Sequence, residues 1–318
     1  MIDPAPAFAG GSVVTVGSFD GVHLGHQAVV REVCQRAVRR GVPAVMVSFE
    51  PHPGAVLAPG SATARLTTAV ERLEVAAELG LERLVVLHFS AALAALPAER
   101  FVTEVLLGRC GMKELVIGTD HGFGHQRGAD STTLPALGER LGFAVAVVDP
   151  MPDATGQAVS STRIRAALAA GELGRVAEWL GRPYRLSARV IPGAGRGKTI
   201  GVPTINLEGP PPEKALPPDG VYAALVEWGG GTAGAMLNQG PRPTVGDVRR
   251  SLEAHLFGVE QDLYGRMVRI GWVERLRDVQ RFPSLDALRA QLVLDREAAL
   301  RILARVPLTS TVRPSAAR

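Results

Sequence analysis

Two histidines three residues apart, His23 and His26, stand in the glycine-rich stretch 17–26. Residues 13–16 form an apolar run that predicts a buried strand, and residues 27–40 have apolar positions at helical spacing. A strand, a glycine-rich turn and a helix together bring backbone N–H groups and a helix N-terminus to a phosphate chain. We therefore predict a nucleotide-binding turn, the alternative being a tight turn that holds histidines by chance. Besides the two histidines, the residues expected at the nucleotide are Gly17, Phe19, Asp20 and Gly25.

A second polar cluster, residues 160–165, combines three hydroxyl groups with two arginines. Serine and threonine are good N-caps, so the cluster predicts the start of a helix. Capping explains one hydroxyl group, whereas a helix N-terminus that also carries arginines can hold a polyphosphate. The cluster is therefore a second candidate for the same nucleotide.

The stretch 193–206 is a second glycine-rich loop. It does not fit the GxxxxGK[ST] frame, which needs a strand before it and a long helix after it. In an extended chain Thr204 and Asn206 point to the same side, where they could share one hard cation such as Mg²⁺. The alternative is an ordinary glycine-rich hairpin. The residues expected to contact phosphates are Gly193, Gly195, Gly197, Lys198, Gly201 and Thr204.

Glu253 and His255 lie on one face of the predicted strand 252–256. A carboxylate there could take the proton from a hydroxyl group as it attacks the γ-phosphate of ATP. For His255 we favour a surface position without a functional role, on the polar outer face of an edge strand.

The first half of the chain must position the histidines. Strands and helices alternate there from residue 12 to about 150, which predicts a doubly wound, Rossmann-like α/β domain with a parallel sheet. Ligands of such domains bind at the carboxyl ends of the strands, and the first strand ends at Gly17. The expected strands are 13–16, 42–49, 84–89, 114–118 and 144–148, and the expected helices are 27–40, 68–79, 97–107 and 132–141.

The second half of the chain has a different residue pattern. After a helical part at 160–181, short β-prone segments follow with glycine- and proline-rich turns between them, which predicts a small antiparallel barrel. These segments are 185–191, 220–228, 233–238, 250–256 and 266–272, and an amphipathic helix is expected at 284–304. We therefore expect one domain at 1–182, a second at 183–306 and a disordered tail at 307–318.

Composition narrows the function classes. The 318 residues are 46% hydrophobic and carry 35 basic and 31 acidic side chains, interspersed, so no nucleic-acid arm is expected. Cys34 and Cys110 have no partners at metal spacing, so we expect two reduced thiols. We find no signal peptide and no apolar run of membrane-spanning length, so we expect no membrane partner and a cytoplasmic location.

These motifs resemble a known family. Residues 17–26 are similar to the HxGH signature of the nucleotidyltransferase superfamily. With 48–53 (SFEPHP) they resemble the adenylyltransferase module of bacterial bifunctional riboflavin kinase/FAD synthetases. Residues 160–165 are similar to its SSTxxR element and 203–206 to the flavokinase PTAN motif, with Ile205 in place of alanine. Further matches are 238–244 (NxGxRPT) and 262–265 (DLYG), so the resemblance extends from Val13 to about Leu303.

The resemblance implies a role for particular residues. Ser161, Thr162 and Arg165 would contact the triphosphate, Thr204 and Asn206 would contact magnesium and phosphate, and Glu253 would be the catalytic base. Pro51, His52, Asp120 and Phe123 would bind the flavin of the first site, and Arg277 the flavin of the second. Besides Ile205, three positions depart from the family pattern: His121 replaces phenylalanine, Ser18 replaces asparagine and Val279 replaces glutamate.

The resemblance also implies a function in two steps. ATP would phosphorylate riboflavin to FMN in the barrel domain, with Mg²⁺, and a second ATP would adenylylate FMN to FAD with release of pyrophosphate. The partners would be small molecules alone. Three alternatives stay open at this point: an enzyme with one of the activities, a non-catalytic flavin or nucleotide sensor, and a nucleotidyltransferase with another acceptor, such as pantetheine phosphate or choline phosphate.

Overall fold

The computed structural model describes residues 8, 10–58, 60, 64–124, 128–193, 197, 201–241 and 250–306. The expected residues Gly195 and Lys198, the end of the NxGxRPT stretch and the tail at 307–318 lie outside these ranges. The chain forms two compact units, Met1–Arg165 and Ala166–Arg318. This division falls before residue 182, since helix α8 (Leu173–Leu180) packs against strands of the second unit. No helix of the described residues is long and apolar enough to cross a membrane.

The first unit is built on a parallel sheet with strand order β3-β2-β1-β4-β7. Its strands are β1 (Ser12–Val16), β2 (Ala44–Glu50), β3 (Arg83–His88), β4 (Met112–Gly118) and β7 (Ala144–Val148). The chain moves from β1 outward to β2 and β3, and then crosses to β4 on the other side of β1. The carboxyl ends of β1 and β4 therefore form the switch point where doubly wound folds bind ligands. The predicted fold of this half is confirmed.

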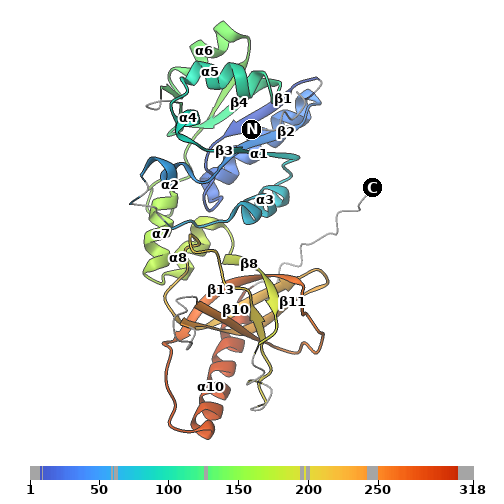
Figure 1. Cartoon of the computed structure of the whole chain (residues 1–318), viewed down its shortest axis with the longest axis vertical. Coiled ribbons are helices and arrows are strands. Elements are labelled where there is room, and N and C mark those ends of the chain that lie inside the picture. Colours follow the sequence, from blue (N-terminus) through green and yellow to red (C-terminus); the bar gives the residue numbers. More distant parts are fainter. Residues whose placement is uncertain are drawn as a thin grey trace. The chain divides into compact units, whose positions relative to one another are not determined.

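Helices cover both faces of this sheet (Figure 1). Helix α1 (Leu24–Arg40) buries Val29 and Val33 against Val13 of β1. On the other face, Val14 packs with residues of α5 (Ala98–Phe101), the π-helix η2 (Val102–Leu107) and α6 (Leu134–Leu141). The remaining elements are α2 (Pro53–Leu57), α3 (Ala69–Glu78), α4 (Ala91–Ala94), the short strands β5 (Gly122–Phe123) and β6 (Ala129–Asp130), and α7 (Ser161–Ala169).

The second unit is a closed antiparallel barrel with strand order β10-β11-β12-β9-β8-β13. Its strands are β8 (Tyr184–Ile191), β9 (Ile205–Leu207), β10 (Gly220–Trp228), β11 (Gly231–Pro241), β12 (Arg250–Leu256) and β13 (Met267–Arg277). The terminal helix α10 (Leu285–Leu303), capped by Ser284, lies against the barrel in Figure 1. Its Ala299 and Leu303 pack on Ala223, Leu225 and Met236. The predicted barrel and its terminal helix are confirmed.

Candidate functional site

The turn between β1 and α1 stacks the two histidines on one another. His23 is the N-cap of α1, and its Nδ1 accepts a hydrogen bond from the His26 backbone N–H at 3.4 Å. The two rings are 3.7 Å apart between centroids and nearly parallel, and the Phe19 ring meets His26 edge-on at 5.1 Å. A Cβ on Gly25 would lie 3.3 Å from the His23 ring, so a side chain there would crowd the stack. The turn thus fixes both imidazoles at the start of a helix.

This turn holds an uncommon backbone conformation. Phe19 and Val22 have φ values of 49° and 41°, in the left-handed region that a β-branched residue such as valine rarely adopts. Conformations of this kind cost free energy and persist only where surrounding contacts enforce them. Here the enforcing contacts include the Gly21 N–H, which donates to the Thr67 hydroxyl at 2.9 Å, and the burial of Phe19 and Val22.

His26 is neutral in this environment. Burial, reinforced by the positive charges that His23 and His121 can carry, lowers the pKa of His26 well below its ordinary value of 6.5. Its Nδ1 is buried, and among the described residues it has no hydrogen-bond partner. A buried polar atom without a partner is costly, so this nitrogen has an unmet capacity for a hydrogen bond.

Asp20 joins the turn to two distant segments. Its carboxylate is almost fully buried and accepts hydrogen bonds from the Leu66 and Thr67 backbone N–H groups at 2.9 and 3.0 Å. The same carboxylate accepts a hydrogen bond from Arg165 of α7 at 2.9 Å. These contacts hold the Asp20 carboxylate against Arg165, so Asp20 orients the Arg165 guanidinium. The expected phosphate contact of Asp20 stays a prediction.

The start of α7 reaches the same turn. The Ser161 hydroxyl donates to the Asp20 backbone carbonyl at 2.8 Å, and Arg165 donates to the Thr162 hydroxyl at 3.1 Å. The structure therefore brings the two clusters predicted from the sequence together across about 140 residues of chain. Arg163 turns elsewhere: it donates to the Asp153 carboxylate at 2.5 Å and to the Ala158 carbonyl at 2.8 Å.

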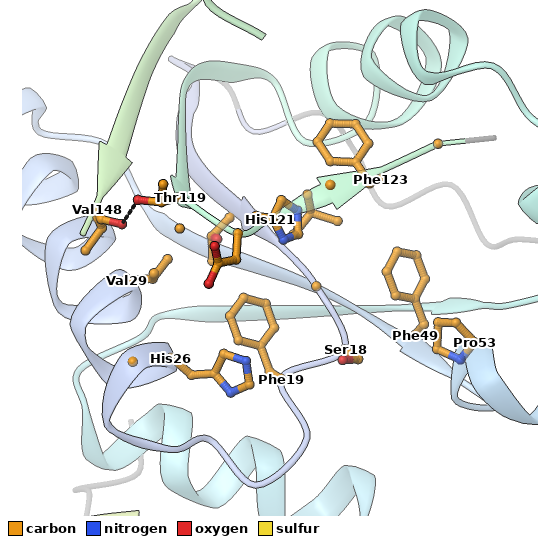
Figure 2. A pocket seen from close by; sticks show the side chains of 18 of the residues that line it. Ser18, Phe19, His26, Val29, Phe49, Pro53, Thr119, His121, Phe123 and Val148 are labelled. Atoms are coloured by element: carbon orange, nitrogen blue, oxygen red, sulfur yellow. Dashed lines mark hydrogen bonds between the residues drawn. The ribbon is translucent and has the colours of Figure 1, made fainter. Parts of the chain in front are cut away.

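A cavity of about 700 Å³ opens at the carboxyl ends of β1 and β4. Figure 2 shows Thr119 and Val148 on one side of it, Phe49, Pro53 and Phe123 on the other, and His26 and Phe19 below. Aromatic rings pack against one another on the second side, with centroid separations of 5.4 Å for Phe49–Phe89 and 5.5 Å for Phe101–Phe123. The cavity thus has one end lined by Gly118, Thr119 and Val148 and another lined by aromatic rings, and His26 lies below in Figure 2.

Most of the residues predicted for flavin binding line this cavity. His52, Asp120, His121 and Phe123 line it, whereas Pro51 is not among the lining residues. The His52 Nδ1 accepts a hydrogen bond from the Gly54 N–H at 3.0 Å, which leaves its other nitrogen as the donor. Sequence analysis missed Phe49, Phe89 and Phe101. Phe49 and Phe89 lie at or just after the ends of apolar strands, and this position in the sequence could have marked them as residues of the site.

Charged residues next to the cavity form a network that the sequence did not reveal. Arg65 and Arg72, both buried, contact the Glu50 carboxylate at 2.5 and 2.9 Å. Burial by itself would raise the pKa of Glu50, but the two arginines outweigh it and hold this pKa below its usual value. Burial lowers the pKa of His52, the charges of Arg65 and Arg72 lower it further, and Asp20 opposes them. His52 is therefore neutral too.

The second unit carries a row of polar side chains across three strands of the barrel. Asn206 of β9 pairs with Glu253 of β12, which pairs with Asn238 of β11. Residues that pair directly in a sheet share one face. This face is the outside of the barrel, because Leu252 and Ala254 beside Glu253 are buried. A carboxylate and two amides are therefore side by side on the barrel surface.

Two described glycines of the stretch 193–206 lie close to these polar residues. A Cβ on Gly193 would overlap the Asn206 amide, and a Cβ on Gly197 would overlap the Val202 backbone carbonyl and come 3.2 Å from the Thr204 hydroxyl. Glycine is therefore required at both positions, at Gly193 by the Asn206 side chain and at Gly197 by the backbone of Val202. Gly201 has a φ of 78°, which also favours glycine. The structure thus places Gly193 and Glu253 beside Asn206, and the roles expected of these residues stay predictions.

Arg277 has a different partner from the one expected. Its Nε and Nη2 donate to the Asp295 carboxylate of α10 at 3.0 and 2.8 Å, and its guanidinium lies 5.5 Å above the Phe282 ring. Both charged groups are largely buried. Arg277 therefore anchors the terminal helix through Asp295, and its expected flavin contact stays a prediction. Val279, where the family usually has glutamate, is 48% exposed.

Comparisons with known proteins agree with both sites. Models of FAD synthetase and riboflavin kinase match residues 5–163 and 180–303. The chain is 37% identical to the bifunctional riboflavin kinase/FMN adenylyltransferase of Escherichia coli strain K12, over 90% of each chain. It is 38% identical to that of Pseudomonas fluorescens, over 91% of this chain and 92% of the relative. A crystal structure described as a macrolide-efflux protein from Streptococcus pneumoniae matches with a TM-score of 0.82 and 32% identity, over 93% and 95% of the two chains.

Proposed function

Because this chain belongs to the bifunctional riboflavin kinase/FMN adenylyltransferase family, we propose that its two sites catalyse two successive reactions. The enzyme phosphorylates riboflavin with ATP to give FMN, and it transfers AMP from ATP to FMN to give FAD and pyrophosphate. We assign the transfer of AMP to residues 1–182 and the phosphorylation to residues 183–306. A cytoplasmic location is part of the proposal, and two free cysteines support it, since a reducing compartment keeps thiols unpaired.

His26, which lines the cavity and stacks on His23, carries the proposal for adenylyl transfer. We place the adenosine of ATP at the end lined by Gly118, Thr119 and Val148, and the flavin at the aromatic end. The ATP phosphates then lie at the start of α1, where backbone N–H groups and the helix dipole favour negative charge.

The adenylyl transfer itself needs positioning more than covalent chemistry. A phosphate oxygen of FMN attacks the α-phosphorus of ATP, and negative charge moves toward the departing pyrophosphate. Neutral His26 donates a hydrogen bond to these oxygens, and Arg165, oriented by Asp20, supplies a positive charge. Groups held in place before the reaction stabilise such charge without further reorganisation. The hydroxyls of Ser161 and Thr162 add donors from the adjoining helix start.

The residues of the barrel site fit a divalent cation held together with ATP. Thr204 and Asn206 offer a hydroxyl and an amide oxygen, which are hard donors that Mg²⁺ accepts, and the loop glycines bring backbone close to both. Bound there, Mg²⁺ would neutralise charge on the ATP phosphates. Asn206 and Thr204 would orient the phosphate chain beneath the loop at 193–201.

Glu253 is the base of this proposed site. It lies directly beside Asn206 on the outer face of the barrel and is half-buried. Its carboxylate accepts the proton of the riboflavin 5′-hydroxyl as the hydroxyl oxygen attacks the γ-phosphorus of ATP and ADP departs. The nucleophile and its base therefore meet at the edge of the cation site.

The test is a time course of purified protein with riboflavin, ATP and Mg²⁺, with the flavins separated by chromatography. FMN followed by FAD is expected. The Glu253→Ala variant should stop FMN formation and still convert supplied FMN to FAD, and His26→Ala should do the reverse. Loss of both activities in either variant would contradict two independent sites, and no conversion of riboflavin or of supplied FMN by the wild type would contradict the proposal as a whole.

A further inference from the structure

His255 makes a hydrogen bond that a plain surface residue does not need. It lies on β12 two residues beyond Glu253, and its Nδ1 is 2.7 Å from the backbone carbonyl oxygen of Pro203. A carbonyl oxygen only accepts, so Nδ1 carries the hydrogen and donates it. The bond joins residues 52 positions apart in the sequence and reaches the residue directly before Thr204.

The hydrogen bond from His255 to Pro203 takes the place of a backbone hydrogen bond beyond the end of the β12–β9 pairing. In the pairing of β12 with β9, Glu253 is opposite Asn206 and Ala254 is opposite Ile205. The next pair in this register would be His255 with Thr204, but β9 begins only at Ile205. The backbone ladder therefore holds Asn206 and ends before Thr204, and the His255 side chain holds the peptide between Pro203 and Thr204 in place of a ladder bond.

The His255 ring is itself held in place. Phe257, which follows directly after the end of β12, meets it edge-on with centroids 5.7 Å apart. The guanidinium of Arg296 from α10 lies 5.9 Å from the centroid of the Phe257 ring. A ring braced from one side and bonded on the other has few rotamers available, so its N–H keeps its direction toward Pro203.

We propose that His255 is a positioning residue of the kinase site, which fixes the Pro203–Thr204 peptide so that the Thr204 hydroxyl faces the same space as Asn206 and Glu253. The inference rests on the proposed phosphorylation in this unit. His255 acts through Thr204 and does not itself contact substrate. Sequence analysis favoured a plain surface place for it, because no spacing rule links a strand residue to a loop 52 positions away.

Three substitutions separate this role from others. His255→Asn keeps a donor where Nδ1 stands, His255→Gln places one where Nε2 stands, and His255→Leu removes both. A net hydrogen bond contributes about 1 kcal/mol, so we expect the Leu variant to lose about fivefold in kcat/KM for riboflavin phosphorylation. The Mg²⁺ concentration for half-maximal rate should rise in the same variant, and Asn should restore both quantities.

Conversion of supplied FMN to FAD by the same samples measures the intact first unit, and denaturant unfolding shows whether the second unit is folded. Rescue by Gln without Asn would overturn the proposal, because His255 would then act through Nε2. Unchanged phosphorylation and unchanged Mg²⁺ dependence in the Leu variant would overturn it as well. If the Leu variant does not fold, the comparison of riboflavin phosphorylation between the Asn and Gln variants still tests the role of Nδ1. A wild type that converts FMN to FAD but leaves riboflavin unchanged would refute the kinase function instead.

A second measurement does not depend on activity. Long-range ¹H–¹⁵N correlation spectra of the full-length protein near pH 8 distinguish the two neutral imidazole tautomers, and loss of one signal in His255→Asn assigns it. A hydrogen on Nδ1 of His255 is expected. The opposite tautomer would overturn the bond to Pro203 and the proposal with it.

Discussion

Replacing Asp20 with asparagine tests whether this residue acts by holding Arg165. Asparagine keeps one oxygen for the Leu66 and Thr67 backbone N–H groups, which now bond to one carboxylate oxygen, but it removes the charge that faces Arg165. A hydrogen bond to a charged group contributes about 2 kcal/mol. We therefore expect the free energy of unfolding to fall by about 2 kcal/mol, and kcat/KM for FMN adenylylation to fall about 30-fold as Arg165 loses its orientation.

Asp153→Asn is a matched control for this variant. The Asp153 carboxylate is also buried, also accepts backbone N–H groups, from Thr155 and Gln157, and also pairs with an arginine of α7, Arg163. It does not line the cavity. The control should lose similar stability and keep its adenylyl transfer.

The assays are denaturant unfolding and the initial rate of FAD formation from supplied FMN, with riboflavin phosphorylation as a reference activity in the same chain. An Asp20→Asn variant that keeps full adenylyl transfer would refute the positioning role. An equal loss of adenylyl transfer in Asp153→Asn would show that stability alone, rather than the orientation of Arg165, sets the rate.

Three further perturbations follow from the geometry. Between the lowered pKa of His26 and its ordinary value of 6.5, the unfolded chain binds more protons than the folded one. The free energy of unfolding should therefore fall as the pH drops below about 6.5. In denaturant titrations at several pH values, the His26→Gln variant should lose less of this free energy than the wild type. Arg277→Ala leaves the charge of the buried Asp295 unpaired, so the free energy of unfolding should fall by about 3 kcal/mol in denaturant titrations, while the KM for riboflavin stays near the wild-type value. A large change in KM with little loss of stability would instead support a contact between Arg277 and the flavin. Gly193→Ala pushes a Cβ into the Asn206 amide and should abolish most riboflavin phosphorylation in a rate assay, whereas Gly229→Ala, which has open space around it, should not.

Much of the first site could be read from the order of residues. A strand, a turn with glycines and a helix form locally, so the place of His23 and His26 at the start of α1 follows from neighbouring residues. The direction of β1 and the parallel sheet then put that turn at the switch point. Local pattern and family motif agree here because the function depends on the backbone of one short segment.

Asp20 and Arg277 show contacts that the sequence did not predict. Asp20 was expected at the nucleotide from its place in the turn, and Arg277 at the flavin from the family resemblance. Their actual partners are Arg165 and Asp295, which lie 145 and 18 residues away. A charged residue forms its strongest contacts with whichever opposite charge is buried beside it, and burial is a property of the folded chain.

The sequence by itself determined the parallel α/β half, the barrel half and the helix that begins at the two histidines, because periodicity and turn residues act over short distances. Only the tertiary structure decided that the cavity ends in a wall of Phe49, Phe89 and Phe101, and that His255 reaches Pro203. Those contacts join segments that the chain brings together after its strands pair, and no local pattern records which side chains will then be neighbours.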